Sequence, residues 1–201
     1  MSEIKYPAGV RPFAENTRKS ASNKKKYTPK IAAGNRGMDF EAGINETNAY
    51  YAEKGLCCIT KRPTPINVVK VDYSKGATIT QAYFETQSTT DYNGVYQGHY
   101  IDFEAKSSHS KTAFPLSNIP LQQIEHLERV IAHGGIAFFL LHMVQHNEVF
   151  LLTAEFVIRF YREHPRASIP YADIKEHGYL VPEGFRPRYD YLPVLKAVFL
   201  K

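Results

Sequence analysis

The residues best suited to chemistry are an aspartate and a glutamate on neighbouring β-rich segments, the glutamate being followed by a lysine. Asp91 opens the first segment, and Glu104 lies near the end of the second, with Lys106 just after it. Because side chains alternate along a strand, Asp102, Glu104 and Lys106 would share one face of the second segment. The sequence therefore predicts a charged strand face with a further acid on the neighbouring strand.

The turn between the two segments decides whether the two acids meet. An Asn93-Gly94 turn is the stronger general hairpin signal, and it would pair Asp91 with Tyr96 and scatter the acids. A Gln97-Gly98 turn would place Asp91 directly across from Glu104, with their Cβ atoms about 5 Å apart. Only the second register creates a site shared by two carboxylates.

Two opposed carboxylates repel each other unless a cation lies between them. Hard oxygen ligands at this spacing suit Mg²⁺, with Mn²⁺ as a substitute, better than they suit zinc. Lys106 would lie close to such an ion, where it is suited to orienting a water nucleophile or stabilising charge on a phosphate. The spacing alone is equally consistent with an exposed charged face on a half-solvated sheet.

The elements that precede this segment follow from hydrophobic periodicity. Residues 37–54 have apolar positions at helical spacing and end at Gly55, and residues 56–60 read as a buried strand. Next come the β-rich segments 66–73 and 78–84, which form a hairpin. Pattern alone leaves two alternatives for this hairpin: a projecting stalk over about 62–86, or an ordinary pair of strands in the main sheet.

The elements that follow alternate between helix and strand. The predicted order is a helix with Pro120 in its first turn and Gly134-Gly135 at its end, a central strand over 136–144, a strand over 148–152, a helix over 154–164 and a cap of short elements from 165 onward. Together the elements predict a single α/β domain with a mixed sheet over 34–201.

The amino-terminal segment differs from the rest in charge. Residues 1–33 hold eight lysines and arginines against two acids, whereas the remainder of the chain is close to neutral. With few large aliphatic residues, this arm is predicted to be disordered without a partner. Its basic residues, Lys24, Lys25 and Lys26 among them, suit phosphate contacts, although such a tail can also be a solubilising or membrane-surface segment.

Two classes of protein are disfavoured by composition. No apolar run is long enough to cross a bilayer and the amino terminus does not resemble a secretory signal, so we expect a cytoplasmic protein with no membrane partner. The adjacent Cys57 and Cys58 suit neither an ordinary disulfide nor a four-ligand zinc site, and they are predicted to be buried strand thiols.

These features carry a resemblance to a known family. A helix with an acid, a strand with Asp91, a strand with Glu-x-Lys and then a helix and a strand resemble the PD-(D/E)xK nuclease superfamily. The stretches 88–96 and 100–106 and the Leu121-Gln122-Gln123 helix look more specifically like the RecU family of Holliday junction resolvases. The resemblance covers nearly the whole chain. It implies a restriction-endonuclease-like mixed sheet flanked by helices, with a projecting β-hairpin stalk.

The resemblance also implies roles for individual residues. Thr89, Asp91, Glu104 and Gln123 would be metal ligands for Mg²⁺, and Lys106 would stabilise the transition state. Glu41 would be an outer ligand by analogy, with a solvated helix acid as the alternative, and Asp102 has no counterpart role and is either an outer-sphere or a surface acid. Lys70 and Lys75 would be phosphate contacts on the stalk.

The family's activity implies an expected function and partners. We expect a homodimeric endonuclease that resolves four-way junction DNA by symmetric nicking in recombination and repair, with a recombinase and a branch-migration motor as partners. A non-catalytic factor that binds branched DNA and acts with a recombinase is the alternative. A glycosidase built on the Asp91 and Glu104 carboxylates is disfavoured by Lys106, by the basic arm and by the absence of tryptophan.

Overall fold

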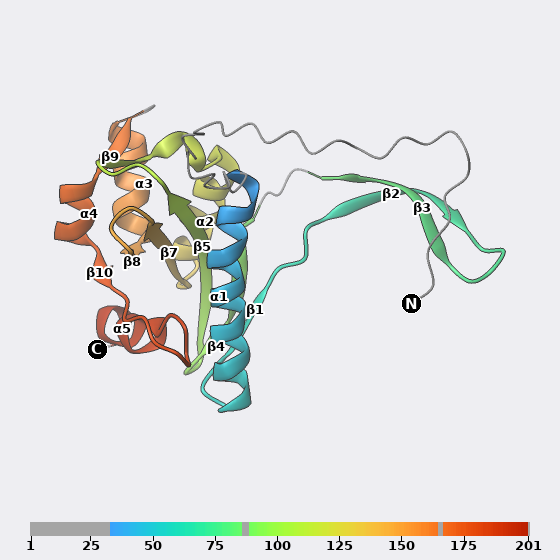
Figure 1. Cartoon of the computed structure of the whole chain (residues 1–201), viewed down its shortest axis with the longest axis horizontal. Coiled ribbons are helices and arrows are strands. Elements are labelled where there is room, and N and C mark those ends of the chain that lie inside the picture. The colour runs from blue at the N-terminus through green and yellow to red at the C-terminus, as the bar shows by residue number, and fades with distance from the viewer. Residues whose placement is uncertain (1–32, 86–88, 165–166, 201) are drawn as a thin grey trace, which may run out of the picture. The chain divides into compact units, whose positions relative to one another are not determined.

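A computed structural model describes residues 33–85, 89–164 and 167–200, with side chains from Asp39 onward. Its centre is a six-stranded sheet in the order β1-β4-β5-β7-β8-β10. The strands are β1 (Cys58–Lys61), β4 (Tyr92–Tyr96), β5 (His99–Ser108), β7 (Ile136–Met143), β8 (Glu148–Thr153) and β10 (Tyr179–Leu180). Neighbouring strands are antiparallel except for the central pair β5 and β7, which is parallel. The predicted mixed α/β architecture is confirmed (Figure 1).

Helices cover the two faces of this sheet. Helix α1 (Ala33–Glu53) and helix α5 (Tyr191–Phe199) contribute to one core, and α2 (Leu121–Ala132), α3 (Ala154–Glu163) and α4 (Tyr171–His177) contribute to the other. A short pairing of β6 (Ala113–Pro115) with β9 (Ser168–Pro170), and the 3-10 turn η1 (Leu116–Asn118), complete the second face. Within the described residues, no helix is long and apolar enough to cross a membrane.

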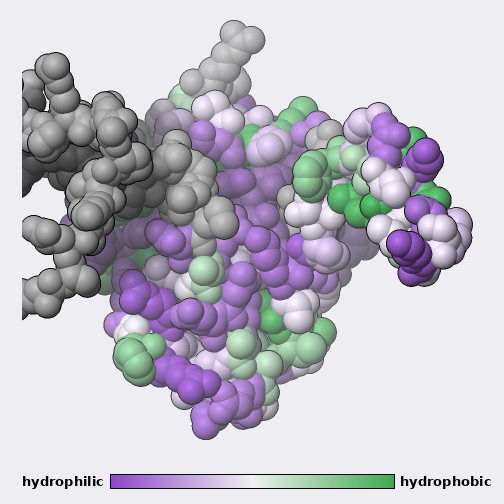
Figure 2. Space-filling model, turned by 45° about the vertical axis from the view of Figure 1, so that its right-hand side comes forward, coloured by the Kyte–Doolittle hydropathy of each residue, from purple (hydrophilic) through white to green (hydrophobic). Residues whose placement is uncertain are grey.

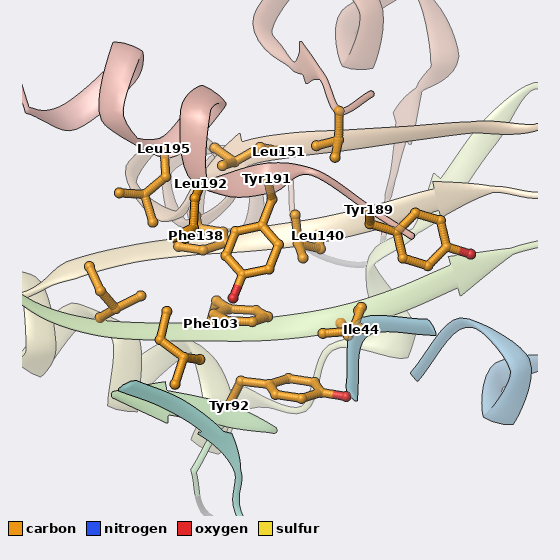
Figure 3. Close-up of a cluster of buried hydrophobic side chains, with 14 of the residues drawn as sticks. Ile44, Tyr92, Phe103, Phe138, Leu140, Leu151, Tyr189, Tyr191, Leu192 and Leu195 are labelled. Atoms are coloured by element: carbon orange, nitrogen blue, oxygen red, sulfur yellow. The ribbon is translucent and has the colours of Figure 1, made fainter. Parts of the chain in front are cut away.

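Stacked aromatic rings fix the alignment of three neighbouring strands on the α1 side. Tyr92 of β4 stacks on Phe103 of β5 at 4.8 Å between ring centroids, and Phe103 stacks on Phe138 of β7 at 4.7 Å. Tyr191 of α5 lies over the last two rings (Figure 3). All four side chains are fully buried, and each ring contributes roughly 2–3 kcal/mol through removal from water. This stack holds β4 and β5 in a single register.

The predicted buried strand over 56–60 is wrong in both bounds and environment. Strand β1 covers Cys58–Lys61 and lies at the edge of the sheet, with only Ile59 buried. Cys57 is half-buried before the strand and Cys58 is exposed, so the prediction of two buried strand thiols is also wrong. An edge strand has a partner on one side only and lies at the margin of the layers that cover the sheet, so fewer neighbours cover its side chains.

The hairpin forms a sheet of its own. Among the described residues, strands β2 (Ile66–Asp72) and β3 (Thr78–Phe84) pair only with each other, from Ile66 opposite Phe84 to Asp72 opposite Thr78. Nearly every residue of both strands is exposed, and Figure 1 draws the hairpin apart from the six-stranded sheet. The alternative of two ordinary strands in the main sheet is therefore wrong.

Candidate active site

The β4–β5 hairpin adopts the register that brings the two acids together. Tyr96 pairs with His99 and Tyr92 pairs with Phe103, so the chain turns at Gln97-Gly98 and the next position places Asp91 across from Glu104. Both turn residues have positive φ, 48° for Gln97 and 82° for Gly98, as the two central residues of a type I′ turn require. The Gln97-Gly98 turn, and not the Asn93-Gly94 turn, is therefore the one that the chain forms.

Gly94 is part of a strand rather than of a turn. It pairs with Ile59 of β1, and a Cβ atom at this position would lie 2.0 Å from the Cys58 carbonyl oxygen. The Asn93-Gly94 signal thus reflects the close approach of a neighbouring strand, a use of glycine that sequence pattern does not separate from a turn.

Glu104 is the centre of the site. Its side chain is fully buried, and Lys106 Nζ lies 2.6 Å from its Oε1 atom. Gln123 Nε2 donates to the same Oε1 atom at 2.8 Å, and the Asp91 backbone N–H donates to Oε2 at 3.0 Å. Burial raises the pKa of Glu104 to about 8; the Lys106 charge opposes this rise and the Asp91 charge adds to it. A cation at this position would relieve the cost of the buried charge.

The other predicted ligands surround Glu104. Asp91 is half-buried, and its Oδ2 atom accepts from the Ala105 backbone N–H at 3.5 Å. Gln123 is 4% exposed, and within the described residues its Oε1 atom is buried without a hydrogen-bond partner. Thr89 is half-buried just before Thr90 and Asp91. The structure therefore brings Asp91, Glu104, Lys106 and Gln123 together. Thr89 lies two residues before Asp91 in the same segment.

The donor set suits a hard divalent cation. In the part of the chain that the structure describes, no group of three or more His, Cys, Asp or Glu side chains is arranged to hold a metal. The candidate ligands are instead two carboxylates, an amide oxygen and a hydroxyl, all oxygen donors of the kind that Mg²⁺ binds. The Gln123 Oε1 atom is a buried acceptor without a partner among the described residues, while Nε2 faces Glu104. Turning the amide by 180° would direct this oxygen toward Glu104, where a cation would satisfy it.

Glu41 lies near the site but is directed to another partner. Its carboxylate pairs with Lys61, and its backbone oxygen accepts from the Tyr92 hydroxyl at 3.2 Å. The charges of Glu41, Asp91 and Glu104 all raise the pKa of Tyr92, after the larger effect of burial, so the three acids lie near this residue. Glu41 is therefore bonded to Lys61 and Tyr92, and its carboxylate has a cationic partner of its own.

Asp102 is fully buried and belongs to a second cluster, which sequence analysis did not identify. Its partners are Arg62, Tyr100, His126 and Thr90. Helix α2 presents both Gln123 and, one turn later, His126 to the charged face of β5. That helical spacing was the available signal, because residues one turn apart lie on the same side of a helix.

The predicted DNA contacts divide into two groups. Lys70 and Lys75 are exposed on the β2–β3 hairpin, whereas Lys24, Lys25 and Lys26 lie outside the described residues, as does nearly all of the predicted arm. The hairpin also exposes large aliphatic and aromatic side chains, and Figure 2 shows green atoms among them at the right of the view. They are Ile66, Val68, Val69, Tyr73, Ile79, Tyr83 and Phe84.

An aspartate beside a Glu-x-Lys strand, on a mixed sheet flanked by helices, is the arrangement typical of the PD-(D/E)xK class of nucleases. Comparison with known proteins identifies the family within that class. The family model described as RecU, recombination protein U, matches residues 35–197. The chain belongs to the RecU family.

Curated relatives extend over almost the whole chain. A protein named Holliday junction resolvase RecU from Bacillus cytotoxicus is 46% identical over 201 residues, which cover 98% of each chain. The protein of the same name from Lactococcus lactis subsp. cremoris is 47% identical over 208 residues, 97% of this chain and 98% of the relative. Among solved structures, Archaeoglobus fulgidus Hjc, a Holliday junction resolvase, matches with 11% identity and a TM-score of 0.40, over 71% of this chain and 94% of that one.

Proposed function

We propose that this protein is a Mg²⁺-dependent endonuclease that resolves four-way DNA junctions. The observation that carries the proposal is the arrangement of Asp91 across from Glu104, with Lys106 Nζ 2.6 Å from the Glu104 carboxylate. Membership of the RecU family supports the choice of substrate, since its relatives carry the name Holliday junction resolvase.

The residues would divide the chemistry among them. Asp91, Glu104, Thr89 and the Gln123 amide oxygen would hold the ion, with Mn²⁺ able to replace Mg²⁺. The bound ion would supply Lewis acidity and a water nucleophile at neutral pH. Lys106, on the same strand face as Glu104, would direct its ammonium group toward the negative charge that develops on the attacked phosphate.

The rest of the molecule would select the substrate. The exposed hairpin, with Lys70 and Lys75, would contact the junction, and the basic arm would add contacts to phosphates. A homodimer would supply two sites for symmetric nicking of two strands. A recombinase and a branch-migration motor are the partners we expect, and the cytoplasm is the expected location.

Replacement of Asp91 by Asn tests the proposal directly. The change removes one charge from the ion site while keeping the shape of the side chain, so junction cleavage in Mg²⁺ should be abolished. Junction binding in chelator, measured by gel shift, should remain. Glu176→Gln, which removes an exposed acid on α4, is the matched control and should cleave normally.

Two outcomes would contradict the proposal. Cleavage retained by the Asp91→Asn protein would remove Asp91 from the chemistry. Junction binding without any cleavage by the unaltered protein in Mg²⁺ would instead favour a non-catalytic factor that uses its hairpin and arm to bind branched DNA.

A further inference from the structure

A second buried carboxylate lies beside the candidate ion site. Asp102 is fully buried on β5, on the same strand face as Glu104. Its Oδ2 atom lies 2.6 Å from Arg62 Nη2 and 2.9 Å from His126 Nε2, and it accepts from the Tyr100 hydroxyl at 2.9 Å. The Thr90 hydroxyl donates to the other oxygen, Oδ1. Both oxygens of this acid are therefore occupied by side chains from other segments.

Two of these partners belong to the segments where the hairpin joins the domain. Arg62 lies between β1 and β2, and Thr90 lies between β3 and β4. Arg62 also donates its backbone N–H to the Asp91 carbonyl oxygen at 2.7 Å. The entry to the hairpin is thus hydrogen-bonded both to Asp102 and to the backbone of a proposed ion ligand.

The remaining contacts connect Asp102 to the other proposed ligands. Thr90 stands between Thr89 and Asp91, so its bond to Asp102 fixes the backbone that carries both. His126 lies one turn after Gln123 on α2, so its contact with Asp102 sets the position of the helix that carries Gln123. Glu104 is on the same strand as Asp102. Each proposed ligand therefore lies either on a segment that is hydrogen-bonded to Asp102 or on the strand of Asp102 itself.

We infer that Asp102 is a positioning residue that fixes the root of the hairpin, the 89–91 segment and helix α2 around the ion site, with Arg62, Thr90 and His126 as its partners. The inference rests on the proposed function, because it concerns the geometry of the same site. Asp102 would act through these partners and not by contact with the ion or the DNA.

Folding alone does not require such a cluster. Removing two charges from water costs several kcal/mol per ion, and a buried ion pair is often no more stabilising than apolar side chains of the same volume. A network with directed hydrogen bonds instead restricts each group to one geometry. Ion ligands need that precision, and loss of a partner behind a ligand typically lowers metal affinity or activity by about 10–100-fold.

Two substitutions from different elements test the inference. His126→Leu removes the α2 contact, and Thr90→Val removes the hydroxyl while keeping a branched side chain. His126→Gln is the conservative variant, because its amide can still donate to Asp102. His133→Leu, an exposed histidine at the end of the same helix, is the matched control.

Three measurements apply to each protein: Mn²⁺ affinity by titration calorimetry without DNA, the Mg²⁺ concentration for half-maximal junction cleavage, and junction binding in chelator. Melting temperatures identify the variants that fold. We expect His126→Leu and Thr90→Val to bind Mn²⁺ about tenfold more weakly and to need about tenfold more Mg²⁺. Junction binding should be unchanged, and His126→Gln and His133→Leu should resemble the unaltered protein.

The inference is overturned if a folded His126→Leu or Thr90→Val protein has the Mn²⁺ affinity and Mg²⁺ requirement of the unaltered protein. It is also overturned if junction binding falls as much as cleavage does. Failure of the proposed function would give a different result, because the unaltered protein would then not cleave junctions at all. The comparison of Mn²⁺ affinities by calorimetry does not depend on cleavage, so it would still decide the role of Asp102.

Discussion

Glu104 is a buried acid that lies close to a second acid. Its carboxylate is fully buried, yet it faces the half-buried Asp91 and has one cation, Lys106, in contact. Burial raises its pKa from 4.5 to about 8. In the absence of a bound ion, the folded state therefore holds a proton on Glu104 more tightly than the unfolded state does. The stability that the protonated Glu104 contributes is fully present below pH 4.5 and is lost as pH rises to about 8.

Replacing Glu104 by Gln should remove that pH dependence. The variant keeps the size of the side chain but cannot ionise, so in chelator its melting temperature should exceed that of the unaltered protein near pH 8 and the difference should shrink toward pH 4.5. Thermal melts across this range, with Glu176→Gln as control, check the prediction. A gap between the two proteins that does not change with pH would show that Glu104 is not the group responsible.

Residue types and spacing predicted only part of this site. Asp91, Glu104 and Lys106 were found from strand alternation once the turn was chosen, and the family resemblance supplied Thr89 and Gln123. Arg62 and His126 were not found, because their partner is Asp102 on another element. Contacts of that kind depend on the packing of a loop and a helix against a strand, and no short pattern in the sequence encodes them.

At the scale of elements, the pairing of β4 with β5 determines that Asp91 lies near Glu104, although the strongest local turn signal favours another register. Gly94 lies where β4 passes closest to β1, and this approach requires a residue without a side chain. The main helices and the central strands were predicted close to their observed bounds, because their apolar periodicity reflects burial on defined faces. It placed β1 in the buried interior because an apolar run does not distinguish an edge strand from a central one.

Gly94→Ala should disrupt the β1–β4 pairing. The added Cβ atom would lie 2.0 Å from the Cys58 carbonyl oxygen and 2.6 Å from Ile59 Cα, both backbone atoms that cannot move aside alone. We expect the free energy of unfolding to fall by about 3 kcal/mol. Urea denaturation measures the change, and Val95→Ala, an exposed neighbour on the same strand, should alter stability by less than about 1 kcal/mol. Equal stability of both variants would contradict the pairing described here.

The hairpin should contribute to junction affinity through its charges. Alanine at both Lys70 and Lys75 should weaken binding in chelator and reduce the slope of log affinity against log salt by about 1 per lysine. Lys175→Ala, an exposed lysine on α4, is the control. A double variant with an unchanged salt slope would mean that the hairpin does not contact phosphates through these two residues.

At the scale of the whole molecule, the net charge of +5 is concentrated in the first 33 residues. We expect a chain beginning at residue 34 to fold with an unchanged melting temperature, because the buried residues of both described cores lie between Phe40 and Leu195. Its affinity for four-way junctions should fall, and its salt dependence should weaken, as phosphate contacts are lost. Gel shifts at several salt concentrations would check this, and unchanged affinity at all of them would assign junction binding to the folded domain alone.

The central claim is that Asp91 and Glu104 share one divalent cation. Anomalous diffraction from crystals soaked in Mn²⁺ tests it most directly, because the ion is located by its own scattering rather than by its effect on activity. We predict a peak in contact with the Asp91 and Glu104 carboxylates and the Gln123 side chain. A peak elsewhere, or none at a Mn²⁺ concentration that supports junction cleavage, would contradict the account.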